Sequence, residues 1–268
     1  MTEEIILSNW TDFSVKIEEI KEKYLGNQIG SRVEKISPLL FRGQENASWP
    51  ITTTLERKVD GEYELMKYME LVLSYSHEIE VFKGKNKWNL PDFLNVESEI
   101  LEKQYISPYI DYLIYMRQFG FPSPLLDWTL SPNIAAYFAV SGQKADESSA
   151  VYVYIEKPSG NKGFWVASHR IIVIDSRLGN DRRHLTQQAC YTIATIWKDN
   201  EKRHYFSSHN HIFSKGSTHQ DILIKIIIPP LVRKNALIAL NHDDINHYTL
   251  FDTEDALIKT MAMKAFDL

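Results

Sequence analysis

The sequence predicts an α+β fold, in which a mixed or antiparallel sheet carries a helical lobe inserted after its first strand. Apolar residues recur at helical spacing across much of residues 58–118, whereas short apolar runs typical of strands lie before and after that block. The chain has no internal repeat and no low-complexity linker. We therefore expect residues 1–268 to form one domain, with the helical insertion at about residues 58–118.

The segment before the lobe predicts a helix, a strand and a loop. Residues 10–25 place apolar side chains at helical spacing, with Lys and Glu on the other face. Residues 36–42 predict a short strand with Arg42 at or near its end. The polar, Thr-rich residues 48–57 predict a loop that covers whatever Arg42 faces.

The lobe predicts two helical regions. Residues 62–82 predict one long helix, and residues 93–119 predict a second region, which Pro108 should interrupt because proline has no backbone N–H. The rest of the chain is richer in strands. We expect strands at residues 150–155, 171–174, 186–197, 222–228 and 247–251, and helices at residues 231–240 and 254–266.

Composition bounds the class of protein. The chain has 268 residues, of which 44% are hydrophobic and 24% charged, as in an ordinary globular protein. A net charge of −5 gives no general attraction to nucleic acid, although an enzyme with a local basic groove is compatible with it. No run approaches the roughly 18–20 apolar residues of a membrane span, so we expect no membrane contact.

The cysteine count and the first residues indicate a compartment. Cys190 is the single cysteine, which excludes an internal disulfide, and it fits a small buried hydrophobe better than a nucleophile. The first ten residues are acidic and lack the pattern of a signal peptide. We therefore expect a cytoplasmic protein.

Residues 117–140 are the most informative stretch. The apolar pair Leu125-Leu126 ends at Asp127-Trp128-Thr129, and Ser131-Pro132 is typical of a helix N-cap and first helical position. A strand end would thus deliver Asp127, Trp128 and Thr129 to a helix N-terminus, a place that attracts phosphate. The same residues also fit a purely structural role, with Asp127 as a turn former and Trp128 as a core anchor.

Three blocks carry a resemblance to a known family. The first is Phe41-Arg42-Gly43, at the end of an apolar run. The second is Gln118 to Ala139, with Leu-Leu-Asp-Trp-Thr and a following Ala-x-Tyr-Phe-Ala helix. The third is the stretch from Arg182 to Tyr191, where a basic pair precedes Gln187. On these blocks the chain resembles the FRG-domain family over roughly residues 5–260, departing from the family pattern at Gln118, Phe119, Ser123-Pro124 and Ala189.

The order of these blocks is similar to that of the ADP-ribosyltransferase fold. There an Arg or His ends the first strand, a Ser-Thr-Ser strand precedes a helix, and a Glu or Gln leads a later strand. The resemblance implies a split mixed or antiparallel sheet and an NAD-dependent ADP-ribosyltransferase, with NAD as substrate and no metal. It further implies a toxin or antiphage effector with an antitoxin partner. Gln187 stands where such enzymes usually keep Glu, which suggests either an acceptor that is already nucleophilic, such as a nucleic-acid base (RNA favoured), or no catalysis at all.

The predicted site follows from that layout. Arg42 supplies an always-ionised fork for phosphate or ribose, and Asp127 and Gln187 are the candidates that hold the ribose, orient the acceptor or stabilise the developing cation. The acids Asp252 and Glu254 are spare candidates for the carboxylate. The remaining predicted NAD-binding residues are Gly43, Gln44, Trp128, Thr129 and Tyr137.

Two alternatives remain open on the sequence. In the first, Arg42 and Asp127 pair to hold the fold of a non-catalytic module that binds a nucleotide or nucleic acid. In the second, a nuclease or hydrolase uses a metal held by His204, His209, His211 and His219, of which His209 and His211 would share one face of a strand. Solvated loop histidines fit that cluster better, and the mildly basic run 198–215 fits an ordinary surface better than an RNA contact.

Overall fold

The fold was taken from a computed structural model, which describes residues 3–25, 37–84, 88–90, 96–101, 108–158, 162, 169–174, 182–214 and 220–268. The strands within these ranges are β1 Glu3–Ile6, β2 Leu40–Gln44, β3 Tyr63–Glu64, β4 Leu125–Thr129, β5 Ser149–Ile155, β6 His169–Ile174, β7 Ala189–Lys198, β8 Arg203–Phe206 and β9 Ile222–Ile228. The helices are α1 Thr11–Leu25, α2 Leu65–Ser74, α3 Ser76–Lys83, α4 Val96–Leu101, α5 Pro108–Gln118, α6 Pro132–Val140, α7 Arg182–Thr186, α8 His209–Ser214, α9 Pro230–His242, α10 His247–Phe251 and α11 Glu254–Phe266.

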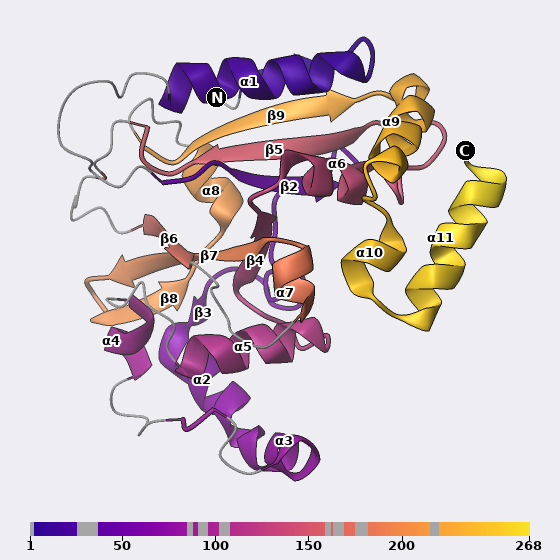
Figure 1. Cartoon of the computed structure of the whole chain (residues 1–268). Coiled ribbons are helices and arrows are strands. Elements are labelled where there is room, and N and C mark those ends of the chain that lie inside the picture. The colour runs from indigo at the N-terminus through magenta and orange to yellow at the C-terminus, as the bar shows by residue number, and fades with distance from the viewer. Residues whose placement is uncertain are drawn as a thin grey trace.

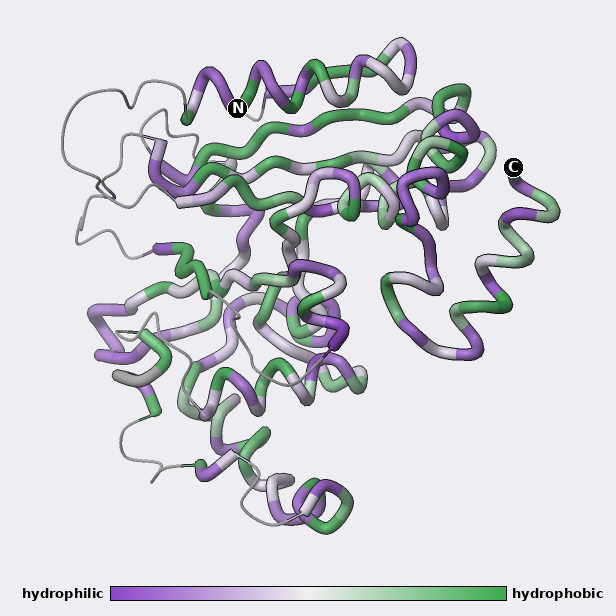
Figure 2. The backbone as a smooth tube through the Cα atoms, viewed as in Figure 1, coloured by the Kyte–Doolittle hydropathy of each residue, from purple (hydrophilic) through white to green (hydrophobic). Residues whose placement is uncertain are grey.

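A mixed sheet joins the described strands, so the predicted α+β class is confirmed. Its order is β1-β9-β5-β2-β4-β7-β8-β3, with β6 paired to β7 (Figure 1). The β1–β9 pair is parallel and the other pairs are antiparallel. Figure 2 shows β5 and β9 as largely hydrophobic ribbons, as expected for strands covered on both faces.

The sheet nearly divides between β2 and β4. One pair of residues, Phe41 and Thr129, joins these two strands, whereas β2 pairs with β5 along all five of its residues. Helices α1, α6 and α9 pack on the β1-β9-β5-β2 half, and α2, α4 and α5 form the lobe beside the β4-β7-β8-β3 half (Figure 1). The two halves therefore diverge at the point where β2 and β4 meet.

Several predicted elements are confirmed and others are corrected. The lobe follows β2 and not the first strand, because residues 3–6 add β1 as a parallel edge strand. The expected long helix at 62–82 divides at Tyr75 into α2 and α3. The expected region 93–119 holds the two helices α4 and α5, and Pro108 is the first residue of α5, as suits a residue without an N–H. The expected strand at 247–251 is helix α10, which an Asn246 capping box starts. No described helix is long and apolar enough to cross a membrane.

The Phe41-Arg42-Gly43 triplet is explained by strand alternation. Successive side chains of β2 point to opposite faces, so Phe41 and Gly43 face α6 and Arg42 faces away from it. A Cβ atom on Gly43 would lie 2.6 Å from the Ala139 backbone nitrogen and closer still to the Ala135 carbonyl oxygen. The close approach of helix α6 therefore requires a glycine at this position.

We predict that Gly43→Ala lowers the free energy of unfolding by about 2–3 kcal/mol, because the new methyl group meets helix backbone that cannot rotate away. Chemical denaturation measures this change. Gly61→Ala is the matched control, since its φ of +82° carries backbone strain of about 1 kcal/mol but no atom lies within 4 Å. A Gly43→Ala variant as stable as the wild type would contradict this account.

Candidate functional site

A cavity of about 880 Å³ opens where β2 and β4 diverge. It is lined from both halves of the sheet, from the loop after β2 and from α6, α7 and α10. The lining residues are Phe41, Arg42, Gly43, Gln44, Glu45, Trp49, Pro50, Thr52, Thr54, Arg57, Arg117, Gln118, Asp127, Trp128, Thr129, Phe138, Arg183, His184, Gln187, Ala189, Tyr191 and Phe251. The structure thus brings the predicted Arg42, Asp127 and Gln187 to one cavity.

Arg42 bridges the gap between the diverging strands. Its Nη1 atom donates a hydrogen bond of 2.8 Å to the Asp127 carbonyl oxygen and lies 3.8 Å from the Asp127 carboxylate. The side chain is 14% exposed, and its buried Nε atom has no hydrogen-bond partner among the described residues. Burial is the main cause that lowers the pKa of Arg42 to about 10. The negative charge of Asp127 acts to raise this pKa, whereas the positive charges of Arg117 and Arg57 lower it further. Arg42 stays cationic at neutral pH, and its buried Nε is a donor that no described residue satisfies.

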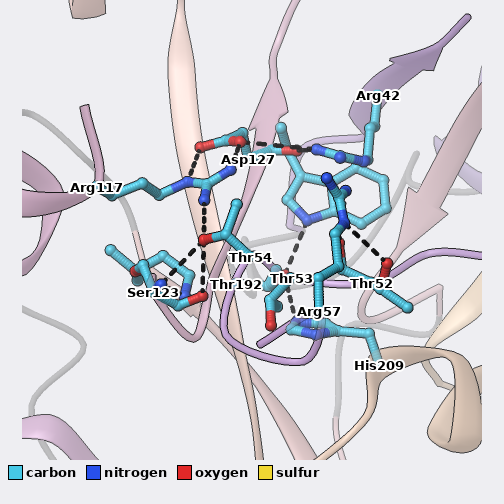
Figure 3. Close-up of polar contacts among 12 residues, drawn as sticks. Arg42, Thr52, Thr53, Thr54, Arg57, Arg117, Ser123, Asp127, Thr192 and His209 are labelled. Atoms are coloured by element: carbon cyan, nitrogen blue, oxygen red, sulfur yellow. Dashed lines mark hydrogen bonds and ion pairs between the residues drawn. The ribbon is translucent and has the colours of Figure 1, made fainter. Parts of the chain in front are cut away.

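Asp127 is held by a second arginine that the sequence reading missed. Arg117 on α5 donates from Nε to Asp127 Oδ1 at 2.6 Å and from Nη2 to Oδ2, which forms a bidentate pair, and from Nη1 to Thr54 Oγ1 at 3.0 Å. Burial would raise the pKa of Asp127, but the charges of Arg117 and Arg42 outweigh it and lower that pKa from 3.8. Asp127 is therefore an ionised anchor between two guanidinium groups (Figure 3).

The Thr-rich loop after β2 covers Arg42, as the sequence predicts. It places Trp49, Thr52, Thr54 and Arg57 in the cavity wall. Arg57 turns back on its own loop, where Nε donates to Thr52 Oγ1 and Nη2 donates to the Thr52 carbonyl oxygen, both at 3.3 Å (Figure 3). These are long, weak contacts, so the Arg57 guanidinium is held near Arg42 without a strong partner of its own.

The opposite end of the cavity is aromatic. Phe138 on α6 and Phe251 on α10 meet edge to face with ring centroids 6.1 Å apart, and the Arg183 guanidinium lies 5.9 Å from the Phe251 ring. Gln187 follows α7 directly, and its Nε2 donates to the Leu250 carbonyl oxygen at 3.1 Å. We call Phe138, Phe251, Arg183 and Gln187 the aromatic end, and Arg42, Arg57, Arg117 and Asp127 the arginine end.

A polar cluster lies between the two ends. His184 Nε2 is 2.7 Å from the Tyr191 hydroxyl and 3.1 Å from Gln118 Nε2, and His184 is 6% exposed. Gln118 stands where the family pattern has a histidine. Helix α7 supplies the His184 imidazole next to Gln118, the amide that replaces the histidine of the family pattern. No local sequence pattern indicated His184.

The other predicted NAD-binding residues divide into two groups. Gln44, Trp128 and Thr129 line the cavity, but the Thr129 hydroxyl donates to the Gln187 carbonyl oxygen at 2.7 Å and so ties β4 to the turn after α7. Tyr137 does not line it, because the helical register of α6 turns Tyr137 into the core and presents Phe138 instead. The spare acids Asp252 and Glu254 are also absent from the cavity wall.

Trp128 is anchored through a buried chain of side chains. Its indole N–H donates to Thr192 Oγ1 at 2.8 Å, which leaves the threonine hydroxyl to donate to His209 Nε2 at 2.9 Å. His209 is fully buried on helix α8, not on a strand as predicted, and burial next to Arg42 lowers its pKa to about 3. His209 is a neutral part of the core, and Trp128 is both core anchor and cavity wall.

The metal-site alternative finds no support among the described residues. They hold no group of three or more His, Cys, Asp or Glu side chains that could bind a metal ion, and His219 lies outside the described ranges. The basic run after β7 is balanced by acids: Lys198 pairs with Glu62, and Arg203 pairs with Glu64. Lys202 pairs with Asp199, so each cation in the described part of this run has an acid partner, and Lys215 lies outside the described ranges.

The comparisons with known proteins support part of the predicted family resemblance. A family model described as the FRG domain matches residues 37–148, which run from just before β2 through the lobe, β4 and α6. Searches of curated proteins and of solved structures gave no match. The FRG resemblance is thus supported for the segment that carries Arg42, Arg57, Arg117 and Asp127, and Gln187 lies beyond it.

We predict that Asp127→Asn costs about 2 kcal/mol of unfolding free energy at pH 7, below the ~3–5 kcal/mol of a fully buried pair, because Asp127 is 44% exposed. The Asp127 pKa is lowered in the folded state, so its stabilisation is complete above the unfolded value of 3.8 and is lost as pH falls through the folded pKa. Denaturation midpoints between pH 2 and 7 measure this.

The expected result is that the wild-type and Asp127→Asn stabilities converge at the acid end of that range. Asp199→Asn is a matched control, because Asp199 is 78% exposed and pairs with a Lys202 that is itself 73% exposed. Parallel pH profiles for the wild type and Asp127→Asn would show that Asp127 is not held as an ionised anchor.

Proposed function

We propose that the cavity binds NAD and that the protein is an NAD-dependent ADP-ribosyltransferase, with a nucleic-acid base, RNA favoured, as acceptor. One observation carries the proposal. Arg42, Asp127 and Gln187, which lie far apart in the sequence, line a single cavity together with aromatic rings. The split of the sheet between β2 and β4, the α6 helix after β4 and the position of Gln187 just before β7 are all similar to the ADP-ribosyltransferase arrangement.

The cavity has the size and chemistry that NAD requires. A volume of about 880 Å³ is at the upper end for a small-molecule site and suits a dinucleotide. Four arginines and two acids line it, which gives a formal charge of plus two inside a chain whose net charge is −5. Arginine is the side chain best suited to pyrophosphate, and the rings of Trp49, Phe138 and Phe251 offer walls for a base or for nicotinamide.

The proposed reaction assigns a part to each group. The bond between nicotinamide N1 and ribose C1′ breaks, its electron pair leaves with nicotinamide, and C1′ acquires oxocarbenium character. A lone pair of the acceptor nitrogen then forms the new bond to C1′, and the acceptor loses a proton to solvent. Gln187 donates its N–H to Leu250, which leaves its amide oxygen to accept from a ribose hydroxyl. Arg42 holds the phosphate or ribose, and Asp127 positions Arg42.

The effector role and an antitoxin partner rest on the FRG resemblance alone. A non-catalytic nucleotide-binding module is the second candidate, and one observation favours it. Asp127, the carboxylate nearest to the predicted catalytic position, is paired to two guanidinium groups, and an amide stands at position 187. A module that binds NAD differs from the transferase only in turnover, and a module that binds another nucleotide or nucleic acid differs also in showing no stabilisation by NAD.

We predict that labelled NAD is consumed with transfer of ADP-ribose to RNA, and that Arg42→Lys lowers the rate on the order of a hundredfold, because lysine keeps the charge but loses the fork that orients the substrate. NAD at about 100 times its Kd should add about 2.7 kcal/mol of stability, a shift of several degrees in Tm. Arg42→Lys should lose this shift. Arg42→Ala is less informative, since Arg42 also ties β2 to β4.

Arg182→Lys is the matched control, because Arg182 is 79% exposed, pairs with Asp252 and lies outside the cavity wall. RNA, DNA and protein acceptors are compared in the same assay. A Tm shift with NAD but no cleavage or transfer would select the module that binds NAD, and no shift and no turnover would exclude both that module and the transferase.

A further inference from the structure

The arginine end of the cavity carries more positive charge than its carboxylate balances. Arg42 and Arg117 converge there on Asp127, and the Arg57 guanidinium lies near Arg42 (Figure 3). Three guanidinium groups against one carboxylate leave a formal excess of two positive charges. Arg42 and Arg117 are largely buried and share Asp127, whereas Arg57 is exposed and has no acid partner, so the excess charge is available to an anionic ligand in the cavity.

The three arginines differ in how many donors they keep. Arg117 uses Nε, Nη1 and Nη2 on Asp127 and Thr54, so it supplies charge and holds Asp127 in place. Arg42 donates only from Nη1, so its Nη2 atom keeps its donors for a ligand in the cavity that Arg42 lines. Arg57 makes only its two 3.3 Å contacts to Thr52, which a stronger acceptor can replace. The direct donors to a ligand are therefore Arg42 and Arg57.

We propose that Arg42 and Arg57, one from the sheet and one from the loop above it, clamp the pyrophosphate group of a dinucleotide, with Arg117 balancing its charge. The inference rests on the proposed function in taking the anion from a dinucleotide. A pyrophosphate that is esterified at both ends carries one negative charge on each phosphorus, which matches the excess of two. A phosphate monoester carries a similar total charge, so the preference for two linked phosphates comes from geometry: Arg57, which no motif indicated, gives each phosphorus a guanidinium group of its own.

The placement fixes the orientation of the substrate. With the pyrophosphate at the arginine end, one ribose with its base extends towards Phe138, Phe251 and Gln187 at the aromatic end. A nucleic-acid backbone fits the arginine end less well, because a ribose separates its successive phosphates, whereas the Arg42 and Arg57 groups converge on one place. The loop that carries Arg57 also carries Trp49, so the clamp and one aromatic wall belong to the same segment.

The test measures binding without turnover. ADP-ribose, AMP and adenosine are titrated against the wild type, Arg57→Gln and the control Arg182→Gln, which removes the same charge outside the cavity. We expect ADP-ribose to bind the wild type at least about tenfold more tightly than AMP, and Arg57→Gln to weaken ADP-ribose about tenfold. Arg57→Gln should leave adenosine unchanged, and Arg182→Gln should leave all three unchanged. Arg57→Lys, which keeps the charge without the fork, should lie between the wild type and Arg57→Gln.

Each outcome decides between the two proposals. ADP-ribose binding that depends on Arg57, in a protein that does not cleave NAD, supports the clamp and excludes the transferase. Turnover of NAD with a KM that Arg57→Gln leaves unchanged supports the transferase and overturns the clamp. Equal affinity for ADP-ribose and adenosine, or an RNA oligonucleotide that binds through Arg57 while ADP-ribose does not, also overturns it. Circular dichroism and the wild-type Tm confirm that Arg57→Gln is folded.

Discussion

The ionic contact of Asp127 with Arg42 and Arg117 is the interaction on which the site depends. Beyond the Phe41–Thr129 pair the two strands β2 and β4 part, and the ladder hydrogen bonds that would join them are missing. Arg42 replaces them with a bond to the Asp127 carbonyl oxygen, and Arg117 draws the lobe helix α5 to the same carboxylate. A sheet that is held open by side chains leaves a cavity where a continuous sheet would leave none. The same three residues therefore determine the fold locally and the charge of the cavity.

The helix α6 imposes the second constraint. It packs so closely on β2 that Gly43 has no room for a Cβ, and its N-terminus is fixed by Ser131, whose hydroxyl accepts from the Ile134 N–H. That register sends Tyr137 into the core and Phe138 into the cavity. A one-residue change of register would exchange them, so the aromatic wall depends on the same close packing that the glycine permits.

Much of the fold and part of the cavity could be predicted from the sequence. The other cavity residues could not, for physical reasons. The strands at β2, β4, β5 and β9 and the helix at α6 follow from apolar runs and capping residues, which act locally. Arg57, Arg117 and His184 reach the cavity only through tertiary packing, and each looks like an ordinary polar residue of a loop or helix in the sequence. Tyr137 was misplaced because periodicity identifies a buried helix but not which buried side chain faces a hollow. Helix α10 was read as a strand because residues 247–251 are too few for periodicity to separate the two, and the capping box at Asn246 decides the matter.

The amide at position 187 and the paired state of Asp127 together limit the acceptors that the proposed transferase can use. Gln187 cannot take a proton, and Asp127 accepts bonds from two guanidinium groups that lower its pKa, so neither is suited to deprotonate a poor nucleophile such as a serine hydroxyl. A ring nitrogen or exocyclic amine of a nucleic-acid base attacks with a lone pair that is already present, and loses its proton after the bond has formed. Gln187 and Asp127 therefore suit an acceptor that needs no general base, and Glu45, the other acid of the cavity wall, is the carboxylate that an acceptor hydroxyl would require.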